Sequence, residues 1–309
     1  MNKREVELLQ RQIKRETLVI KALEVQYRSA LGLVNEKIRI LQSDELTQSR
    51  IYRIEYQQAL KLQIQAIIDK LQGDMYTTIQ QYLHDSYMDS FIGTVYNMHG
   101  QGLPLILPID QKAAVKAILT DSQINEGLYK ALGVDASKLK KSITNEITRG
   151  IASALTYNEI ARNISNASQA PLSRAKLIVR TESHRIQQEA AYDSSLEAKA
   201  HRAAVVNQWC AVLDGRTRDT HRKLDGQIRE VGEPFEIDGK AAKYPGGFGD
   251  PAEDCNCRCV LLTRAVSALD EDELHTLQER AEYWGLDKTK DFEEFKEKYL
   301  QTMQEGKEK

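Results

Sequence analysis

The first forty residues carry an apolar repeat that restricts this segment to a long helix. An apolar side chain recurs at every seventh position, at Val6, Ile13, Ile20, Tyr27, Val34 and Leu41. The position three residues further on is only partly apolar, because Glu16 and Lys37 interrupt it. A heptad repeat in which one of the two core positions is always apolar predicts a helix that packs against a neighbouring helix.

A second apolar stripe predicts a partner for that helix. Ser43 and Asp44 can cap a helix start, and the stripe follows with Tyr56, Leu60, Ile64, Ile67 and Leu71. Gly73 is expected to break or bend this helix. The two segments predict a helical hairpin roughly 40–50 Å long, at 1.5 Å per residue. The heptad edge could equally be buried against another chain.

The sequence pattern changes from helical to strand-like near residue 203. The segment Ala203–Leu213 has strand character, a polar helical turn ends at Gly226, and Asp238-Gly239 predicts a turn between short strands. We therefore predict an α+β fold, mostly α, with four divisions: 1–102, long N-terminal helices; 103–202, a helical body; 203–265, a small α+β unit that carries the cysteines; and 266–309, an acidic helical tail.

Several features of the sequence limit the class of protein to which the chain can belong. No run approaches 18 apolar residues, which argues against a membrane span. The charged N-terminus lacks the apolar core of a secretory signal. Four cysteines in 309 residues are too few for a secreted disulfide scaffold, so we expect the reducing cytoplasm as the place of synthesis.

Charge is distributed unevenly along a chain whose net charge is −2. Residues 136–229 contain 16 Lys/Arg against 9 Asp/Glu, whereas residues 266–309 contain 7 against 13. A basic middle beside an acidic tail is typical of a surface that faces a polyanion. Ordinary solvated helix faces explain the same counts, and we favour that interpretation of the counts alone.

The small unit contains all four cysteines and a histidine within a stretch of fifty residues. Zinc takes four such ligands in a tetrahedron, and the candidates are Cys210, His221, Cys257 and Cys259, with Cys255 as an alternative. Buried core thiols explain the pattern equally well. A disulfide from Cys210 to one of the other three ranks behind both, and catalysis by a thiol with His221 ranks last.

Two polar motifs allow both a functional and a structural interpretation. Asp214, Arg218, His221 and Asp225 crowd the turn before Gly226, where a His–Asp pair could do acid–base chemistry or simply stabilise the turn. Arg180 could bind a phosphate or form a salt bridge. We favour the structural interpretation of both motifs.

These motifs occur in an order that resembles the phage head-morphogenesis family, also called minor head or minor capsid proteins and typified by the F protein of phage Mu. The resemblance covers residues 174–259. It rests on Arg180, Thr181 and Glu182, then Trp209, then Asp214, Arg218, Asp225 and Gly226, and finally "NCRC". Overall length and the acidic tail also look like the family's member in a Bacillus siphophage.

The resemblance implies a minor head protein of a tailed phage and no enzyme. Such proteins bind the portal protein, lie inside the head at the portal vertex, and aid head morphogenesis and DNA packaging, retention or ejection. The implied location is the virion, after assembly in the host cytoplasm. The implied partners are the portal, phage double-stranded DNA and scaffold or major capsid protein, with no membrane. The basic residues assigned to DNA are Lys138, Lys140, Lys141, Arg222 and Lys223.

The family pattern also implies one structural zinc. Some relatives have a C-x-x-C where this chain has Arg218 and His221. Arg218 cannot be a ligand, so the implied set is His221, Cys257 and Cys259 with Cys210 or Cys255 fourth. Two rival hypotheses remain: a DNA-binding structural protein that acts without the portal, and an enzyme centred on His221 and a thiol.

Overall fold

The computed structural model has a mostly helical α+β fold, as the sequence predicted. It describes residues 1–39, 54–110, 117, 137–139, 141–143, 145–146, 149, 157–167, 169–266, 279 and 281–305. The chain divides into two compact units. Unit 1 contains Met1–Glu16, Tyr82–Ser122 and Arg180–Lys309, and unit 2 contains Thr17–Gln81 and Gln123–Val179. The four divisions drawn from the sequence stay a prediction.

Unit 2 is built from parts of long helices. Helices α1 (Lys3–Arg39), α3 (Ile54–Gly100) and α7 (Gln169–Ala200) contribute residues to both units, and α6 (Tyr157–Ala167) belongs to unit 2 alone. The heptad positions Ile20, Tyr27 and Val34 are buried here, as predicted. Ile64 and Leu71 of the second stripe are also buried. Leu41, Ser43, Asp44 and the side chains of Tyr56 and Leu60 lie outside the described residues.

The predicted break at Gly73 is wrong, because α3 continues through it to Gly100. A glycine inside a helix costs only about 1 kcal/mol relative to alanine. Leu71 and Met75, on either side of it, are both buried. Burial of these side chains outweighs the local preference of the glycine.

The heptad prediction also fails at its N-terminal end, in unit 1. Val6 is 39% exposed and Ile13 is 58% exposed. A straight helix drifts by about 20° per heptad relative to a strict seven-residue repeat. Ile13 is only one heptad before the buried Ile20, so a drift of this size does not expose it. The elements that pack on each part of α1 decide which heptad positions are buried. None of the described helices is long and apolar enough to cross a membrane.

A three-stranded antiparallel sheet lies in unit 1. Strand β1 (Val205–Cys210) is central, between β2 (Ile228–Glu230) and β5 (Val260–Ala265). In the β1–β5 register Trp209 is opposite Leu261 and Cys210 is opposite Val260. Along β1, buried and partly exposed residues alternate, so one face of the sheet covers a core.

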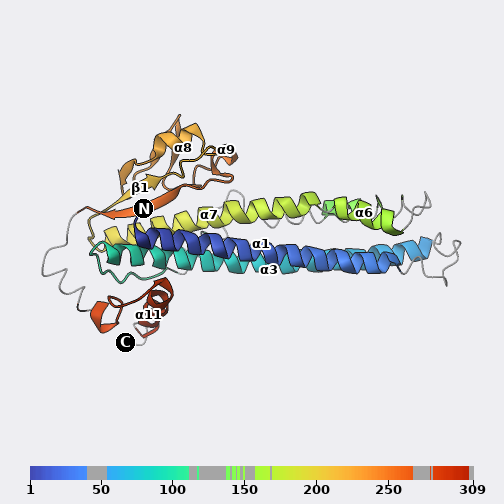
Figure 1. Ribbon diagram of the computed structural model, residues 1–309, viewed down its shortest axis with the longest axis horizontal. Coiled ribbons are helices and arrows are strands. Elements are labelled where there is room, and N and C mark those ends of the chain that lie inside the picture. The colour runs from blue at the N-terminus through green and yellow to red at the C-terminus, as the bar shows by residue number, and fades with distance from the viewer. Residues whose placement is uncertain are drawn as a thin grey trace. The chain divides into compact units, whose positions relative to one another are not determined.

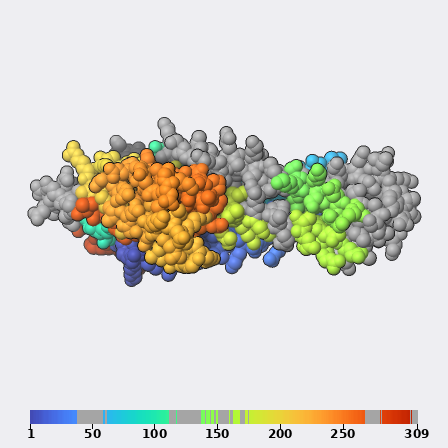
Figure 2. Space-filling view, turned by 90° about the horizontal axis from the view of Figure 1, so that it is seen from above, coloured from blue at the N-terminus to red at the C-terminus, as the bar shows by residue number. Residues whose placement is uncertain are grey.

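Shorter elements complete the region 203–265, which we call the small lobe. Helix α8 (Asp219–Leu224) follows β1, the hairpin β3 (Phe235–Ile237) and β4 (Lys240–Ala242) comes next, and α9 (Pro251–Asp254) precedes β5. The predicted turn is confirmed, since Asp238 and Gly239 have φ of 49° and 78°. Gly226 also takes a positive φ, 77°, as expected. Figure 2 shows the small lobe, coloured from yellow to orange, as one continuous surface.

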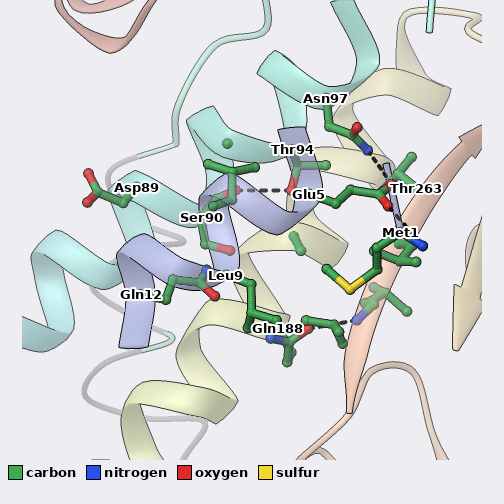
Figure 3. A pocket seen from close by; sticks show the side chains of 16 residues that line it. Met1, Glu5, Leu9, Gln12, Asp89, Ser90, Thr94, Asn97, Gln188 and Thr263 are labelled. Atoms are coloured by element: carbon green, nitrogen blue, oxygen red, sulfur yellow. Dashed lines mark hydrogen bonds and ion pairs between the residues drawn. The ribbon is translucent and has the colours of Figure 1, made fainter. Parts of the chain in front are cut away.

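Polar contacts join the small lobe to the helices of unit 1. They surround a pocket of about 60 Å³ between α1, α3, α7 and β5. Figure 3 shows Glu5 beside Asn97, whose Nδ2 donates to Oε1 of Glu5 over 3.2 Å. Glu5 also pairs with Arg264, and Oε1 of Gln188 accepts a hydrogen bond from the backbone of Leu261 over 2.7 Å. The start of α1 thus holds strand β5 in place.

Helix α11 (Phe292–Glu305) covers the other side of these helices (Figure 1). Phe295 packs on the rings of Tyr96 and His99, with centroid distances of 5.1 Å for both. The hydroxyl of Tyr299 donates to the carbonyl of Leu107 over 2.6 Å and accepts from its amide over 2.8 Å. The end of the acidic tail is therefore helical, as predicted, and is packed into unit 1.

Candidate metal centre

Two thiols and an imidazole meet inside the small lobe. The ligand atoms of His221, Cys257 and Cys259 all lie within 4.8 Å of one another, and the three side chains are buried. Nδ1 of His221 is 3.2 Å from Sγ of Cys259 and 3.6 Å from Sγ of Cys257. The two cysteines precede β5, and their side chains reach the same histidine. The structure thus brings together three of the predicted ligands.

Helix α8 is fixed at both ends, which positions His221. Before the helix, the guanidinium of Arg218 donates to the carbonyl of Cys255 over 2.6 Å. After it, the carboxylate of Asp225 accepts from the amide of Ala211 over 2.7 Å. The amide of Gly226 then donates to the carbonyl of Trp209 over 2.8 Å. These bonds connect α8 to β1 and to residues 255–259, which we call the cysteine segment.

A buried glutamate stands behind the imidazole. Nε2 of His221 lies 3.3 Å from Oε2 of Glu253, an ion-pair distance whose geometry is not that of a hydrogen bond. Glu253 also accepts from Thr220 Oγ1 and from Lys240 Nζ, each over 3.0 Å. A carboxylate behind a histidine is the usual outer support of a metal ligand. The sequence analysis missed Glu253, since only the fold brings α9 to α8.

The local electrostatics favour a thiolate. A hydrogen bond from the Cys257 thiol lowers the pKa of Cys259, burial opposes that effect, and His221 lowers the pKa further. The same hydrogen bond, together with burial, raises the pKa of Cys257 well above its ordinary value. One proton shared by two sulfurs leaves one sulfur negative, which is the form that binds a metal.

An aromatic core surrounds this cluster. Trp209 is fully buried, and its ring lies 6.1 Å from His221, 5.3 Å from Phe235 and 5.8 Å from Phe248. Cys257 and Cys259 belong to the same apolar core. The buried-thiol interpretation and the zinc interpretation are therefore both compatible with the packing.

The other two cysteines are not brought to the cluster. Cys210 follows Trp209 on β1 and therefore points to the opposite face of the sheet. Cys255 ends α9, and it too lies outside the group of three ligands. All four cysteines are free thiols. Of the four proposed ligands, the structure thus places His221, Cys257 and Cys259 together and leaves Cys210 apart.

The remaining motif residues stabilise unit 1. Glu182 is fully buried and forms a 3.2 Å ion pair with Arg185, while Thr181 beside it is also buried. Arg180 is half exposed and pairs with Glu16 over 3.2 Å. Asp214 accepts two hydrogen bonds from Arg258, over 2.6 and 2.7 Å, and these bonds hold its pKa well below the ordinary range.

The basic residues assigned to DNA fall into both units. Lys138 and Lys141 are exposed and belong to unit 2, whereas Lys140 lies outside the described residues. Arg222 and Lys223 belong to unit 1. Arg222 donates to the carbonyls of Thr217 and Asp214 over 3.2 and 2.6 Å. Lys223 lies 3.9 Å from Asp238.

Comparison with known proteins identifies a family and several proteins to which this chain is similar. Residues 141–262 match the family described as Phage Mu protein F like protein. The chain is 32% identical over 215 residues to the minor head protein GP7 of Bacillus phage SPP1, covering 66% of this chain and 67% of that protein. It is 28% identical over 239 residues to the NAD(+)--arginine ADP-ribosyltransferase EFV of Enterococcus faecalis, covering 76% of this chain.

The chain spans only about half, 49%, of that Enterococcus protein. An uncharacterised protein of Haemophilus influenzae is 25% identical over 139 residues, covering 44% of this chain and 27% of that protein. No solved structure matches.

Proposed function

Because the chain belongs to the family of phage minor head proteins related to protein F of phage Mu, we propose that it binds the portal protein inside the head of a tailed phage. There it would aid head morphogenesis and DNA packaging, retention or ejection. The observation that carries the proposal is the 32% identity to a minor head protein over two thirds of that protein. The portal, scaffold or major capsid proteins are its proposed partners.

An architectural role is supported by what the motif residues contact. Glu182, Asp214 and Asp225 are engaged in ion pairs and hydrogen bonds within unit 1, and His221 is 2% exposed. Groups used in this way stabilise a fold. The test is mass spectrometry of purified virions and of procapsids assembled without portal protein. We expect the chain in virions and not in portal-free procapsids, and equal amounts in both would contradict portal-dependent incorporation.

We further propose one structural zinc on His221, Cys257 and Cys259. The donor set supplies three of the four ligands that zinc takes, since two sulfurs and one imidazole nitrogen converge, and Glu253 lies behind the ring. When bound, zinc would cross-link α8 to the start of β5. Elemental analysis of protein purified without chelator should give about one zinc per chain, lost in Cys257→Ser and kept in Cys210→Ser. A content below about a tenth of an equivalent would exclude the site.

Binding of duplex DNA is a separate part of the proposal. It is supported by the excess of basic residues over 136–229, with Lys138 and Lys141 exposed. Phosphate contacts release counterions, so the affinity should fall steeply with salt. A Lys138→Gln, Lys141→Gln double variant should show a shallower salt slope than the wild type. A flat salt response of the wild type would remove DNA from the list of partners.

A second candidate function is ADP-ribosyl transfer, which only the likeness to the Enterococcus protein favours. It predicts release of nicotinamide from NAD⁺ in the presence of an arginine acceptor. We expect none above the protein-free background. Turnover that His221→Ala abolishes without unfolding the chain would replace the architectural proposal with an enzymatic one.

A further inference from the structure

A groove of about 840 Å³ lies within unit 1, next to the candidate metal centre. One wall is formed by α1 and α7, with Ile13 and Arg180 among its residues. The opposite wall is formed by the loop after β1 and the cysteine segment, with Val212, Arg216, Arg218 and Arg258. Its size is that of a site for a small ligand or a short chain segment.

The charged residues of the groove are mostly arginines. Four arginines and one acidic residue, Glu16, line it. Arg258 is neutralised by Asp214, and Arg180 by Glu16. Arg218 donates to a carbonyl group, and Arg216 is exposed. Neither forms an ion pair with a carboxylate among the described residues. These two guanidinium groups leave the groove with an excess of positive charge, which attracts an anionic ligand.

The same groove offers aliphatic surface. Ile13 is 58% exposed and Val212 is 36% exposed, and Leu9 and Val260 also line the groove. Aliphatic side chains and arginines together match a ligand that has both an apolar face and carboxylates. No phenylalanine, tyrosine or tryptophan is among the described residues of the lining. The groove therefore lacks the stacking platforms on which proteins bind single-stranded nucleic acid.

We propose that this groove binds an acidic segment of a partner protein, with the segment's aliphatic side chains on Ile13 and Val212 and its carboxylates on Arg216 and Arg218. Arginine suits this role because its planar group pairs with a carboxylate through two hydrogen bonds. The aliphatic contacts would set the register of the segment along α1. The inference stands on the groove and does not depend on which head protein supplies the segment.

The test uses the full chain and a fluorescein-labelled synthetic peptide of 14 residues, with leucine and glutamate at helical spacing, followed by fluorescence anisotropy. Two comparators are the same peptide with glutamine for glutamate and an oligothymidylate of 14 nucleotides. We expect saturable binding of the acidic peptide, at least about tenfold tighter than the glutamine peptide, a factor worth about 1.4 kcal/mol. The oligonucleotide should neither bind more tightly nor displace the peptide.

Matched variants locate the binding. Arg216→Glu should weaken the acidic peptide at least tenfold, whereas Lys243→Glu, an exposed lysine of the small lobe outside the groove lining, should change it less than twofold. Ile13→Asp should weaken binding of the acidic peptide about fivefold. Leu213 is 62% exposed, and Leu213→Asp should weaken this binding less than twofold. All four positions are exposed, so the fold should persist, which circular dichroism checks.

The proposal would be overturned by equal binding of the acidic and glutamine peptides, by tighter binding of the oligonucleotide in competition, or by equal effects of Arg216→Glu and Lys243→Glu. Absence of saturable binding of the acidic peptide would overturn it as well. None of these results bears on recovery of the chain with the portal protein, so failure here and failure of the proposed function are distinguishable.

Discussion

Nε2 of His221 lies 3.3 Å from Oε2 of Glu253, while Nδ1 of the same ring faces the sulfurs of Cys257 and Cys259. The glutamate thus lies behind the ring, on the side opposite the nitrogen that faces the thiols. Thr220 and Lys240 fix the glutamate in turn. This chain of contacts ties α8, α9, β4 and the cysteine segment into one structure.

Replacing Glu253 with glutamine should weaken zinc binding by about tenfold or more, because the support behind the histidine loses its charge. Competition with a chromophoric chelator measures the affinity. Glu236→Gln is the control, since Glu236 is exposed on β3 of the same lobe. Equal affinities of the two variants would show that Glu253 does not support a ligand.

Replacing Glu182 with glutamine should cost about 3–5 kcal/mol of unfolding free energy, because it leaves the buried Arg185 without one of its carboxylate partners. Arg180→Ala breaks an exposed pair and should cost less than about 1 kcal/mol. Urea unfolding compares the two variants. A larger loss from Arg180→Ala would mean that the motif serves something other than stability.

Acidification should destabilise the chain through His99. Burial lowers the pKa of His99 from 6.5 to about 4, and its Nε2 lies 2.7 Å from the carbonyl oxygen of Leu105. The folded state therefore binds fewer protons than the unfolded state, and this contribution is complete above pH 6.5 and is lost as the pH falls toward 4. The loss is at most about 3 kcal/mol, because part of the ring contacts solvent.

His99→Gln isolates that contribution. Between pH 7 and pH 4.5, the unfolding free energy of the variant should fall less than that of the wild type, whatever their difference at pH 7. Parallel falls would show that the acid sensitivity arises from other groups.

Gly239→Ala should destabilise the small lobe by about 1–2 kcal/mol, because the backbone there has a φ of 78°. No atom would lie within 4 Å of the added methyl group, so conformational strain alone causes the loss. Gly215→Ala is the control, since Gly215 is equally open and has no positive φ. Thermal unfolding that shows equal losses for both variants would contradict this origin.

The features that the sequence could predict are local. A turn at Asp238-Gly239 and a left-handed Gly226 follow from backbone preferences of two or three residues, and both occur. The alternation of side chains along a strand also places Trp209 and Cys210 on opposite faces. Cys210 as a fourth ligand is inconsistent with this alternation, because Trp209 faces the core that contains Cys257 and Cys259.

The features that failed or were missed depend on distant contacts. Ile13 fits a heptad, but which part of α1 is buried is decided by the elements that pack against it. Glu253 supports His221 from a helix 32 residues further along the chain, and no spacing rule joins the two. Gly73 predicts a helix break when only its local preference is considered. The burial of Leu71 and Met75, which favours a continuous helix, depends on tertiary contacts.

The central claim is that the chain is an architectural head protein that binds the portal. Its most direct test is co-expression of the full chain with the portal protein encoded in the same phage genome, followed by affinity purification of the portal and gel filtration. We predict that the chain elutes with the portal in a fixed ratio. Elution of the two as separate species from an assembly-competent lysate would contradict the claim.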